Sequence, residues 1–543
     1  MNIIGGKNMM YDPFDYPYPS RRMVTYGEKG MAATSQHLAA QAGLDIIKSG
    51  GNAVDAAVAV AACLTVTEPT SNGIGGDLFA LVWSTGKLFG LNSSGPSPEG
   101  ISLSDVKRKG FTEIPKYGWI PVTVPGIPAG WAALINRFGK LPFCEVLKPA
   151  ITYAREGFAV STILSGAWRG AYEGYKKNLK GEEFSYWFDT FAKGGRTPKP
   201  GEVWKSEDHA RTLECIAESK AECFYKGHIA DAIDCFSKKF NGYLRKEDLA
   251  RYKPEWVDPI KINYRGYDVW EMPPNGHGLV ALSALNIVKG FDFNEKETVE
   301  TYHKQIEALK LAFADGGKYI ADPKAMSVDV SDLLCETYAG QRRRLINDKA
   351  ISPVPGKPPS GGTVYLATAD GQGNMVSLIQ SNYMGFGSGL VVPGTGIALH
   401  NRGNNFVTEE EHCNCLAPGK RPYHTIIPGF LTKNNQAVGP FGVMGGFMQP
   451  QGHMQVIMNT VDFHLNPQQA LDAPRWRWVE GKKIEVEPGV PDNVIKQLLQ
   501  KGHELKVQKE PGGYGRGQII WRTDDGTLCG GTEPRTDGAV VAW

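Results

Sequence analysis

The residue best placed for chemistry is Thr363, which stands where a proline- and glycine-rich segment meets an apolar one. The preceding residues, 352–362, read SPVPGKPPSGG. Proline prevents regular backbone hydrogen bonding and glycine adds conformational freedom, so we interpret this segment as an exposed linker. Gly361 and Gly362 allow the strained backbone geometry in which the Thr363 hydroxyl would attack the carbonyl carbon of Gly362. Such an attack, an N-to-O acyl shift and hydrolysis would cut the chain before Thr363.

A cut at this point would give Thr363 a free α-amine beside its own hydroxyl. The ordinary pKa of an α-amine is about 7.7–8.0, so a useful fraction can act as a base near neutral pH. One residue then supplies both nucleophile and general base, and no histidine partner is needed. The sequence has no Gly-x-Ser-x-Gly elbow, no His-Glu-x-x-His motif and no Walker loop. By position alone, however, a threonine that opens a strand is far more often structural than catalytic.

Two strand-like segments directly after the linker must position this threonine. Residues 363–369 and 375–380 flank the sequence DGQGN, which is typical of a turn. An antiparallel hairpin is therefore predicted, with Thr363 at its first position. Further strands are expected at residues 78–83, 267–270, 396–399, 429–432 and 518–522.

Helices are expected mainly before the linker. Ser35 is predicted to cap a helix over residues 38–47, and Asn52 to cap an alanine-rich helix over residues 53–64 that is thin enough to pack closely on a sheet. Further helices are expected in the largely helical stretch 141–345, which includes 299–315, and at 455–462. The part before the linker is thus predicted to be helix-rich and the part after it β-rich.

Composition and charge narrow the class of protein. The 543 residues are 41% hydrophobic and 21% charged, which is ordinary for a soluble globular enzyme. The net charge is +2 with no dominant basic block, so we expect neither nucleic acid nor an anionic membrane as a partner. Residues 1–22 lack the apolar run of a Sec signal peptide, and residues 53–66 are too short to span a bilayer. A cytoplasmic location is the expectation.

Cysteine usage gives little sign of disulfides or metals. Nine cysteines, an odd number scattered over the chain, indicate reduced thiols rather than a disulfide framework. Cys413-Asn414-Cys415, with His400 and His412 nearby, is the one group that resembles a metal site. Structural zinc sites usually pair two Cys-x-x-Cys knuckles, so we interpret this segment as a polar loop with free thiols. No metal and no other cofactor is expected.

Several segments from residue 30 to the C-terminus form a characteristic series. They are 30–35 (GMAATS), 50–57 (GGNAVDAA), 68–69 (EP), 73–76 (GIGG), 124–126 (VPG), 309–315 (LKLAFAD), 418–422 (PGKRP), 445–446 (GG) and 533–535 (EPR). In type and order this series resembles the γ-glutamyltranspeptidase family of N-terminal-nucleophile hydrolases.

The resemblance implies an α+β fold, the four-layer αββα sandwich of that family. It also implies a large subunit (residues 1–362) and a small subunit (residues 363–543) cut from one precursor between Gly362 and Thr363, with Thr363 as nucleophile. The two subunits would form one body, and a homodimer of such heterodimers is a further expectation. The family commonly has Thr-Thr-His or Thr-Thr-Tyr at the cut, whereas this chain has TVY. Loss of the second hydroxyl predicts slower processing.

Two further catalytic elements follow from the resemblance. Counted along the hairpin, Ser381 falls where the family places a threonine that hydrogen-bonds the nucleophile, and a serine hydroxyl can do the same. Gly445 and Gly446 match the glycine pair whose backbone N–H groups form the oxyanion hole. Each such donor is worth about 3–4 kcal/mol of transition-state stabilisation.

The substrate pocket departs from the family. Family members bind a substrate α-carboxylate with an arginine ahead of an Ala-Pro pair, but residues 92–98 (NSSGPSP) contain none. Asn405, with Arg402 nearby, stands in place of the aspartate that binds the α-ammonium group. His424-Thr425 replaces a pair of serines, and Tyr383 completes the predicted substrate-binding set.

These replacements predict a different substrate charge. A neutral amide beside a cation disfavours an ammonium group and favours an anion. Arg402, with His424, is therefore predicted to hold a substrate carboxylate; the alternative is that Arg402 forms an internal ion pair. The segment 406–420 is shorter than the corresponding segment of family members that carry a lid over the site. A shorter segment predicts an open site that admits water, and water favours hydrolysis over transfer to an amine.

Three functions remain open from the sequence. The first is an autoprocessed amidohydrolase that acts on a small carboxylated amide of oxamate, glutaryl or γ-glutamyl type. The second is a true γ-glutamyltransferase or glutathione hydrolase. The third is an unprocessed, inactive scaffold, which a denaturing gel would reveal as a single band.

Overall fold

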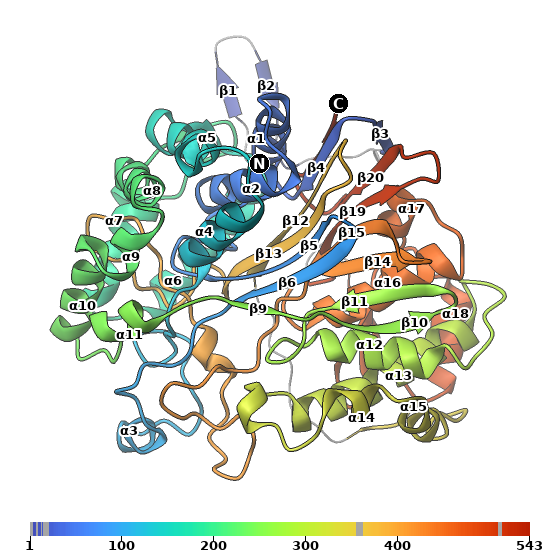
Figure 1. Cartoon of the computed structure of the whole chain (residues 1–543). Coiled ribbons are helices and arrows are strands. Elements are labelled where there is room, and N and C mark those ends of the chain that lie inside the picture. The colour runs from blue at the N-terminus through green and yellow to red at the C-terminus, as the bar shows by residue number, and fades with distance from the viewer. Residues whose placement is uncertain (1–3, 7–8, 12–13, 15–20, 354–361, 509–512) are drawn as a thin grey trace.

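Two seven-stranded antiparallel sheets lie face to face at the centre of the molecule (Figure 1). This computed structural model describes residues 4–6, 9–11, 14, 21–353, 362–508 and 513–543, so the predicted linker lies mostly outside the described residues. The first sheet has the order β21 (Ala539–Ala542), β4 (Gly30–Thr34), β12 (Gly362–Asp370), β13 (Met375–Tyr383), β5 (Asp77–Ser84), β6 (Lys87–Ser93), β9 (Glu255–Val257). The second has the order β10 (Ile260–Tyr264), β11 (Tyr267–Glu271), β14 (Gly429–Lys433), β15 (Gln436–Met444), β19 (Arg516–Arg522), β20 (Leu528–Thr532), β3 (Thr25–Gly27).

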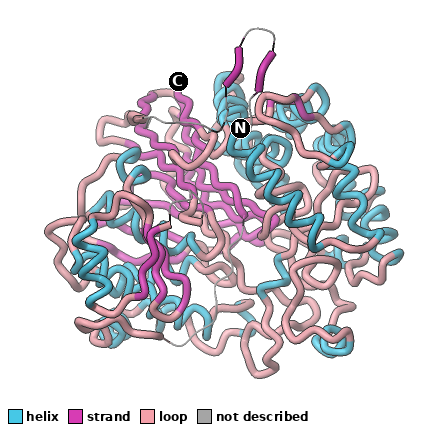
Figure 2. The backbone as a smooth tube through the Cα atoms, turned by 180° about the vertical axis from the view of Figure 1, so that it is seen from behind, coloured by secondary structure: helices cyan, strands magenta, loops and turns pink. Residues whose placement is uncertain are grey.

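Helices cover the outer faces of both sheets, which gives the predicted four-layer αββα sandwich (Figures 1 and 2). The first sheet is covered by α1 (His37–Lys48), α2 (Ala53–Thr67) and α4 (Ile127–Phe138), with α5 (Phe143–Glu156) packed on α2 and α8 (Glu207–Ser219) packed on α5. The second is covered by α12 (Gly278–Val288) and α16 (Met448–Val461), with α13 (Val299–Tyr319) packed on α12. None of the described helices combines the length and the hydropathy that crossing a membrane requires.

Shorter elements complete the described chain. The remaining helices are α3 (Leu103–Arg108), α6 (Thr162–Asn178), α7 (Ser185–Phe191), α9 (Glu222–Tyr225), α10 (His228–Lys239), α11 (Lys246–Arg251), α14 (Val330–Leu334), α15 (Glu336–Arg343), α17 (Pro467–Asp472) and α18 (Asp492–Gln500). Short 3-10 helices are η1 (Glu182–Phe184), η2 (Lys193–Gly195), η3 (Pro323–Ala325) and η4 (Arg402–Asn405). Small sheets pair β1 (Ile4–Gly6) with β2 (Met9–Tyr11), β7 (Phe158–Ala159) with β8 (Val203–Trp204), and β16 (Trp476–Glu480) with β17 (Lys483–Val486) and β18 (Glu504–Val507).

The first two helices show how local sequence sets the fold. Asn52 caps α2 as predicted, in a reciprocal capping box with Asp55, and every residue of α2 is buried. The predicted cap of α1 is wrong by one residue. Gln36 accepts the first N–H groups of α1, because the hydroxyl of Ser35 instead donates to buried Glu68 at 2.5 Å.

The predicted hairpin is confirmed and is the centre of the first sheet. β12 and β13 pair from Val364 opposite Gln380 to Ala369 opposite Met375, with a register shift between Gly362 and Val364. All residues of β13 are buried, since the hairpin lies between α2 and the second sheet. Its open end, where β12 begins and β13 finishes, carries the predicted nucleophile.

Other sequence predictions need correction. Residues 396–399 do not form a strand: only Ala398 and Leu399 make isolated bridges, because Gly394 and Gly396 have left-handed φ values of 70° and 71°. The helix expected at 455–462 begins at Met448. β15 was not predicted, since Gly439, Pro440 and Gly442 interrupt its apolar pattern.

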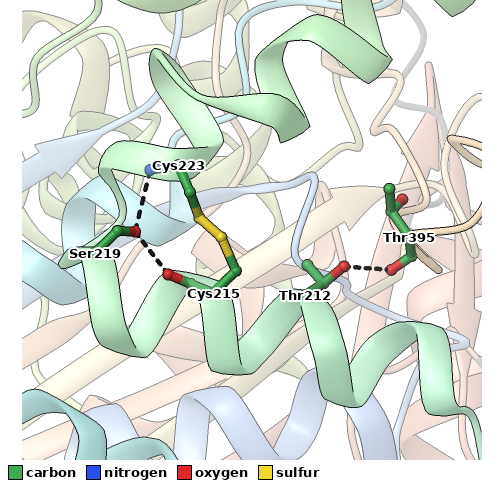
Figure 3. Close-up of a disulfide and its surroundings, with 5 residues drawn as sticks. All are labelled: Thr212, Cys215, Ser219, Cys223 and Thr395. Carbon is green, nitrogen blue, oxygen red and sulfur yellow. Dashed lines mark hydrogen bonds between the residues drawn. A yellow bond between two sulfur atoms is a disulfide. The ribbon is translucent and has the colours of Figure 1, made fainter.

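One cysteine pair contradicts the expectation of reduced thiols. Cys215 in α8 and Cys223 in α9 form a disulfide (Figure 3). They meet because Lys220 and Ala221, both with left-handed φ, turn the chain back between the two helices. The other seven cysteines, all within the described ranges, are free. Near this disulfide, Thr212 donates to the backbone oxygen of Thr395 at 2.8 Å, which ties α8 to the part of the chain after the linker (Figure 3).

Candidate active site

The open end of the β12–β13 hairpin holds Thr363 and Ser381 together. Thr363 is 3% exposed, and its Oγ1 donates to Ser381 Oγ at 3.2 Å. Ser381 Oγ also accepts the backbone N–H of Tyr383 at 2.7 Å. The two residues that the resemblance joined as nucleophile and partner are therefore in hydrogen-bond contact, and both belong to rigid, buried strands.

A third side chain, which sequence reasoning missed, reaches the same hydroxyl. Gln449, in the first turn of α16, has its Nε2 3.5 Å from Thr363 Oγ1. Its backbone N–H donates to the carbonyl of Gly446 at 3.1 Å. The available signal was its position three residues after the glycine pair, in a helix whose start was predicted too late.

Gly445 and Gly446 form the turn between β15 and α16. Their φ values, 136° and 60°, lie in the region that favours glycine, and a Cβ on Gly445 would sit 3.0 Å from the Cα of Gly515. The turn is bare backbone at the positive end of a helix dipole, a favourable place for developing negative charge. Its hydrogen bond to Gln449 places it beside Thr363, although the oxyanion hole itself stays a prediction.

Arg402 lies in η4 and is fully buried against the end of β13. Its Nη1 donates to Thr425 Oγ1 at 2.7 Å, and its Cζ lies 4.5 Å from the ring centre of Tyr383. Burial lowers its pKa to about 10, so the guanidinium stays charged at neutral pH. Within the part of the chain that the structure describes, Arg402 Nε and Nη2 and the Tyr383 hydroxyl have no hydrogen-bond partner.

An acidic residue that was not predicted, Asp77, faces this arginine. Its Oδ2 lies 3.6 Å from Arg402 Nε, which is longer than a hydrogen bond, and accepts from His424 Nε2 at 2.9 Å. Burial raises the pKa of Asp77, but His400 and His424 outweigh burial and hold it well below its usual range. The predicted internal ion pair of Arg402 thus exists as a loose contact that leaves guanidinium donors unused.

His424 is neutral in this arrangement. Burial lowers its pKa to about 3, and its Nδ1 accepts the backbone N–H of Ile426 at 3.3 Å. The proton of the imidazole is therefore on Nε2, where it is donated to Asp77. His424 lies beside Arg402, as the predicted pair requires, but it brings no positive charge.

Asn405 and Thr425 also lie next to Arg402. Thr425 accepts its Nη1 hydrogen bond, while Asn405 Nδ2 donates to the backbone oxygen of Tyr423 at 3.0 Å. The structure thus brings together the predicted substrate-binding residues: Tyr383, Arg402, Asn405, His424 and Thr425. Asp77 was missed because its contacts come from segments more than 300 residues away in sequence.

The residues that resembled a metal site do not converge. His412 Nε2 and Cys413 Sγ bond to the backbone oxygens of Gly317 and Lys318, whereas His400 faces Asp77. Among the described residues, a different group, His303, Glu307 and His503, has ligand atoms within 4.8 Å of one another.

Most of the ligand atoms in that second group have hydrogen-bond partners within the protein. His303 Nε2 faces the backbone oxygen of Asn347 at 2.7 Å and must donate to it, so its Nδ1 accepts from His503 Nε2 at 2.8 Å. Lys310 Nζ, at 2.7 Å from Glu307, already supplies the cation. Of the ligand atoms in this cluster, His503 Nδ1 has no hydrogen-bond partner among the described residues, and the others belong to a buried hydrogen-bond network.

Most of the chain matches one known protein family. The family model described as Gamma-glutamyltranspeptidase matches residues 39–543. The chain belongs to the γ-glutamyltranspeptidase family. It is accordingly an amide-hydrolysing enzyme of that family, as its relatives are.

Three relatives within or close to the γ-glutamyltranspeptidase family span nearly the whole chain. The crystal structure of cephalosporin acylase from Bacillus halodurans has 62% sequence identity and a TM-score of 0.96, and the match covers 98% of this chain and 99% of that one. The glutathione hydrolase-like YwrD proenzyme of Bacillus subtilis (strain 168) is 37% identical over 95% of this chain and 98% of its own length. The oxamate amidohydrolase proenzyme of Klebsiella pneumoniae subsp. pneumoniae is 32% identical over 95% of this chain and 98% of its own length.

Proposed function

We propose that this chain is an autoprocessed amide hydrolase whose nucleophile is Thr363, freed by cleavage after Gly362. The observation that supports this most directly is the hydroxyl of Thr363, buried at the start of β12 and 3.2 Å from Ser381 Oγ. Both curated relatives reported above carry the word proenzyme in their names, which supports a cut precursor.

The cleavage step follows from the position of the hydroxyl. Thr363 Oγ1 attacks the carbonyl carbon of Gly362, the bond from that carbon to the Thr363 nitrogen breaks, and the acyl group passes from nitrogen to oxygen while the proton of Oγ1 ends on that nitrogen. Water hydrolyses the resulting ester. The products are a large subunit that ends in the carboxylate of Gly362 and a small subunit that begins with the amine of Thr363.

The same atoms then perform turnover. The free amine takes the proton of Oγ1 as this oxygen attacks the substrate carbonyl carbon, and then gives a proton to the leaving amine. The backbone N–H groups of Gly445 and Gly446 are proposed to stabilise the oxyanion. Water hydrolyses the acyl-enzyme, which releases the acid and restores the hydroxyl.

The surroundings of Arg402 support a substrate with a carboxylate on its acyl part. Arg402 Nε, Arg402 Nη2 and the Tyr383 hydroxyl are buried donors without hydrogen-bond partners in the described chain, and leaving such donors unsatisfied costs about 1–3 kcal/mol each. The contact of Arg402 Nε with Asp77 Oδ2, at 3.6 Å, is an ion pair but too long for a hydrogen bond. A carboxylate would accept from all three. Tyr383 is also held at a φ of 74°, a strained conformation of the kind found at ligand sites.

Glutaryl-type and oxamate-type amides are therefore the substrates we expect, together with acylated cephalosporins in view of the relative of 62% identity. The test compares wild type with Thr363→Ala on a denaturing gel and in a product-release screen against oxamate, glutaryl and γ-glutamyl amides. We expect two bands and hydrolysis for wild type, and one full-length band with no activity for Thr363→Ala. A variant that still splits or still hydrolyses amides would refute Thr363 as nucleophile.

A glutathione hydrolase is the second candidate, because the curated relative of 37% identity is named glutathione hydrolase-like. The neutral Asn405 opposes it, since a γ-glutamyl substrate carries an α-ammonium group that an acidic residue binds better. Release of glutamate from glutathione, accelerated by glycylglycine, would favour this second candidate over the first.

A further inference from the structure

Gln449 connects three parts of the site from within the protein core. Its side chain is fully buried, and its Nε2 lies 3.5 Å from the hydroxyl oxygen of Thr363. Its Oε1 accepts the backbone N–H of Ile427 at 2.9 Å, two residues beyond Thr425 in the substrate pocket. Its own backbone N–H bonds to the carbonyl of Gly446. One residue thus contacts the segments that carry the nucleophile, the pocket and the glycine turn.

The orientation of this amide is determined by its partners. A backbone N–H can only donate, so the atom that faces Ile427 must be the amide oxygen. The amide nitrogen therefore faces Thr363 Oγ1 and presents a hydrogen to it. Because Thr363 Oγ1 donates its own proton toward Ser381, its lone pairs are free to accept from Gln449.

We propose that Gln449 is a catalytic residue, which donates a hydrogen bond to Thr363 Oγ1 whenever this oxygen carries negative charge. The inference rests on the proposed function. Oγ1 becomes negative as it loses its proton during attack and again when it leaves the acyl-enzyme carbon. Gln449 transfers no proton: the α-amine of Thr363 takes and returns it. At the first turn of α16 the helix dipole acts in the same direction.

The distance of 3.5 Å between Gln449 Nε2 and Thr363 Oγ1 is long for a hydrogen bond, as expected for a contact that shortens during the reaction. Donors to a reacting atom are often loose in the unliganded site and shorten as charge develops. A contact that strengthens in the transition state raises kcat, whereas one that is equally strong in the ground state changes KM alone. Gln449 is therefore expected to affect kcat.

The experiment compares Gln449→Met with Gln451→Met in the full chain. Methionine keeps the length of the side chain and removes the amide. Gln451, also buried in α16, donates to the backbone oxygens of Phe447 and Trp478, so its variant loses comparable hydrogen bonds without touching Thr363. A hydrogen bond to a charged group predicts a loss of about ten- to hundred-fold in kcat for Gln449→Met, with KM within about two-fold. Self-cleavage should slow as well, because the same oxygen attacks Gly362.

Two results would overturn the inference: a kcat of Gln449→Met equal to that of wild type, or an equal loss of kcat in Gln451→Met. If the methionine variant fails to fold, Gln449→Asn keeps the amide but withdraws it by one methylene, and an unchanged kcat there would overturn the inference too. Failure of the proposed function would give a different result. The wild-type chain would then stay in one piece, and the Thr363→Ala variant would keep its activity.

Discussion

At the scale of single residues, the proposed substrate pocket contains an arginine, Arg402, whose charge is only partly compensated by a protein carboxylate. Asp77 approaches Arg402 but also accepts from His424, and the neutral histidine adds no positive charge. The guanidinium keeps donors free for a ligand. The loose ion pair of Arg402 with Asp77 is therefore compatible with the proposed carboxylate site.

Replacing Arg402 by glutamine tests that assignment. The variant loses charge-assisted hydrogen bonds to the substrate carboxylate, each worth about 1.5–3 kcal/mol, so KM for a glutaryl amide should rise by about ten- to hundred-fold. The matched substrate is a neutral acyl amide of similar length, whose KM should change by less than about three-fold. Initial-rate kinetics on both amides measure the difference. An equal change on both would remove Arg402 from the carboxylate site.

At the scale of elements, α2 supports the hairpin that carries Thr363, and its cap is a point where stability can be tested. Asn52 accepts two N–H groups of α2 and donates to the backbone oxygen of Phe138 at 2.6 Å. Asn52→Ala should therefore cost about 1–2 kcal/mol. Urea unfolding of the uncleaved Thr363→Ala chain measures it.

The control for this cap is Asn466→Ala in α17. Asn466 forms a capping box with Gln469 at an exposed helix start. Asn466→Ala should lower the free energy of unfolding by less than Asn52→Ala does, since water hydrates the exposed N–H groups of α17 when the cap is lost. Equal losses at both positions would show that burial of α2 adds nothing to the cap.

The same elements show what the sequence can and cannot predict. The hairpin and the cap of α2 were predictable, because alternation, turn residues and Asn52 act over a few positions. Ser35 was a reasonable cap, but the buried Glu68 from another segment takes its hydroxyl. Asp77 could not be predicted as a site residue, since its contacts come from segments distant in sequence. For Gln449 the one local signal was its position after the glycine pair, and its contact with Thr363 also joins distant segments.

At the scale of the whole molecule, both sheets mix strands from before and after the proposed cut. In the first sheet, β12 pairs with β4 on one side and with β13 on the other, and β13 in turn pairs with β5. In the second, β11 pairs with β14 and β20 pairs with β3. The two pieces are therefore joined through continuous hydrogen-bonded sheets.

This mixing predicts that cleavage leaves the body intact. The two pieces should elute together in native gel filtration, at the same volume as the uncleaved Thr363→Ala chain, and separate in denaturant. The reason is that every strand pairing across the cut would have to break at once. Separate elution of the pieces under native conditions would contradict the sheet topology.

Because both sheets combine strands from the two pieces, refolding should be efficient before cleavage and inefficient after it. While the chain is continuous, β12 meets β4 as a neighbour tethered to it, at a local concentration fixed by the polymer between them. After the cut, the same strands must find each other by diffusion, and renaturation depends on how much protein is present. We therefore expect the severed enzyme to regain activity poorly from dilute denaturant, while the uncut chain recovers its shape at any dilution.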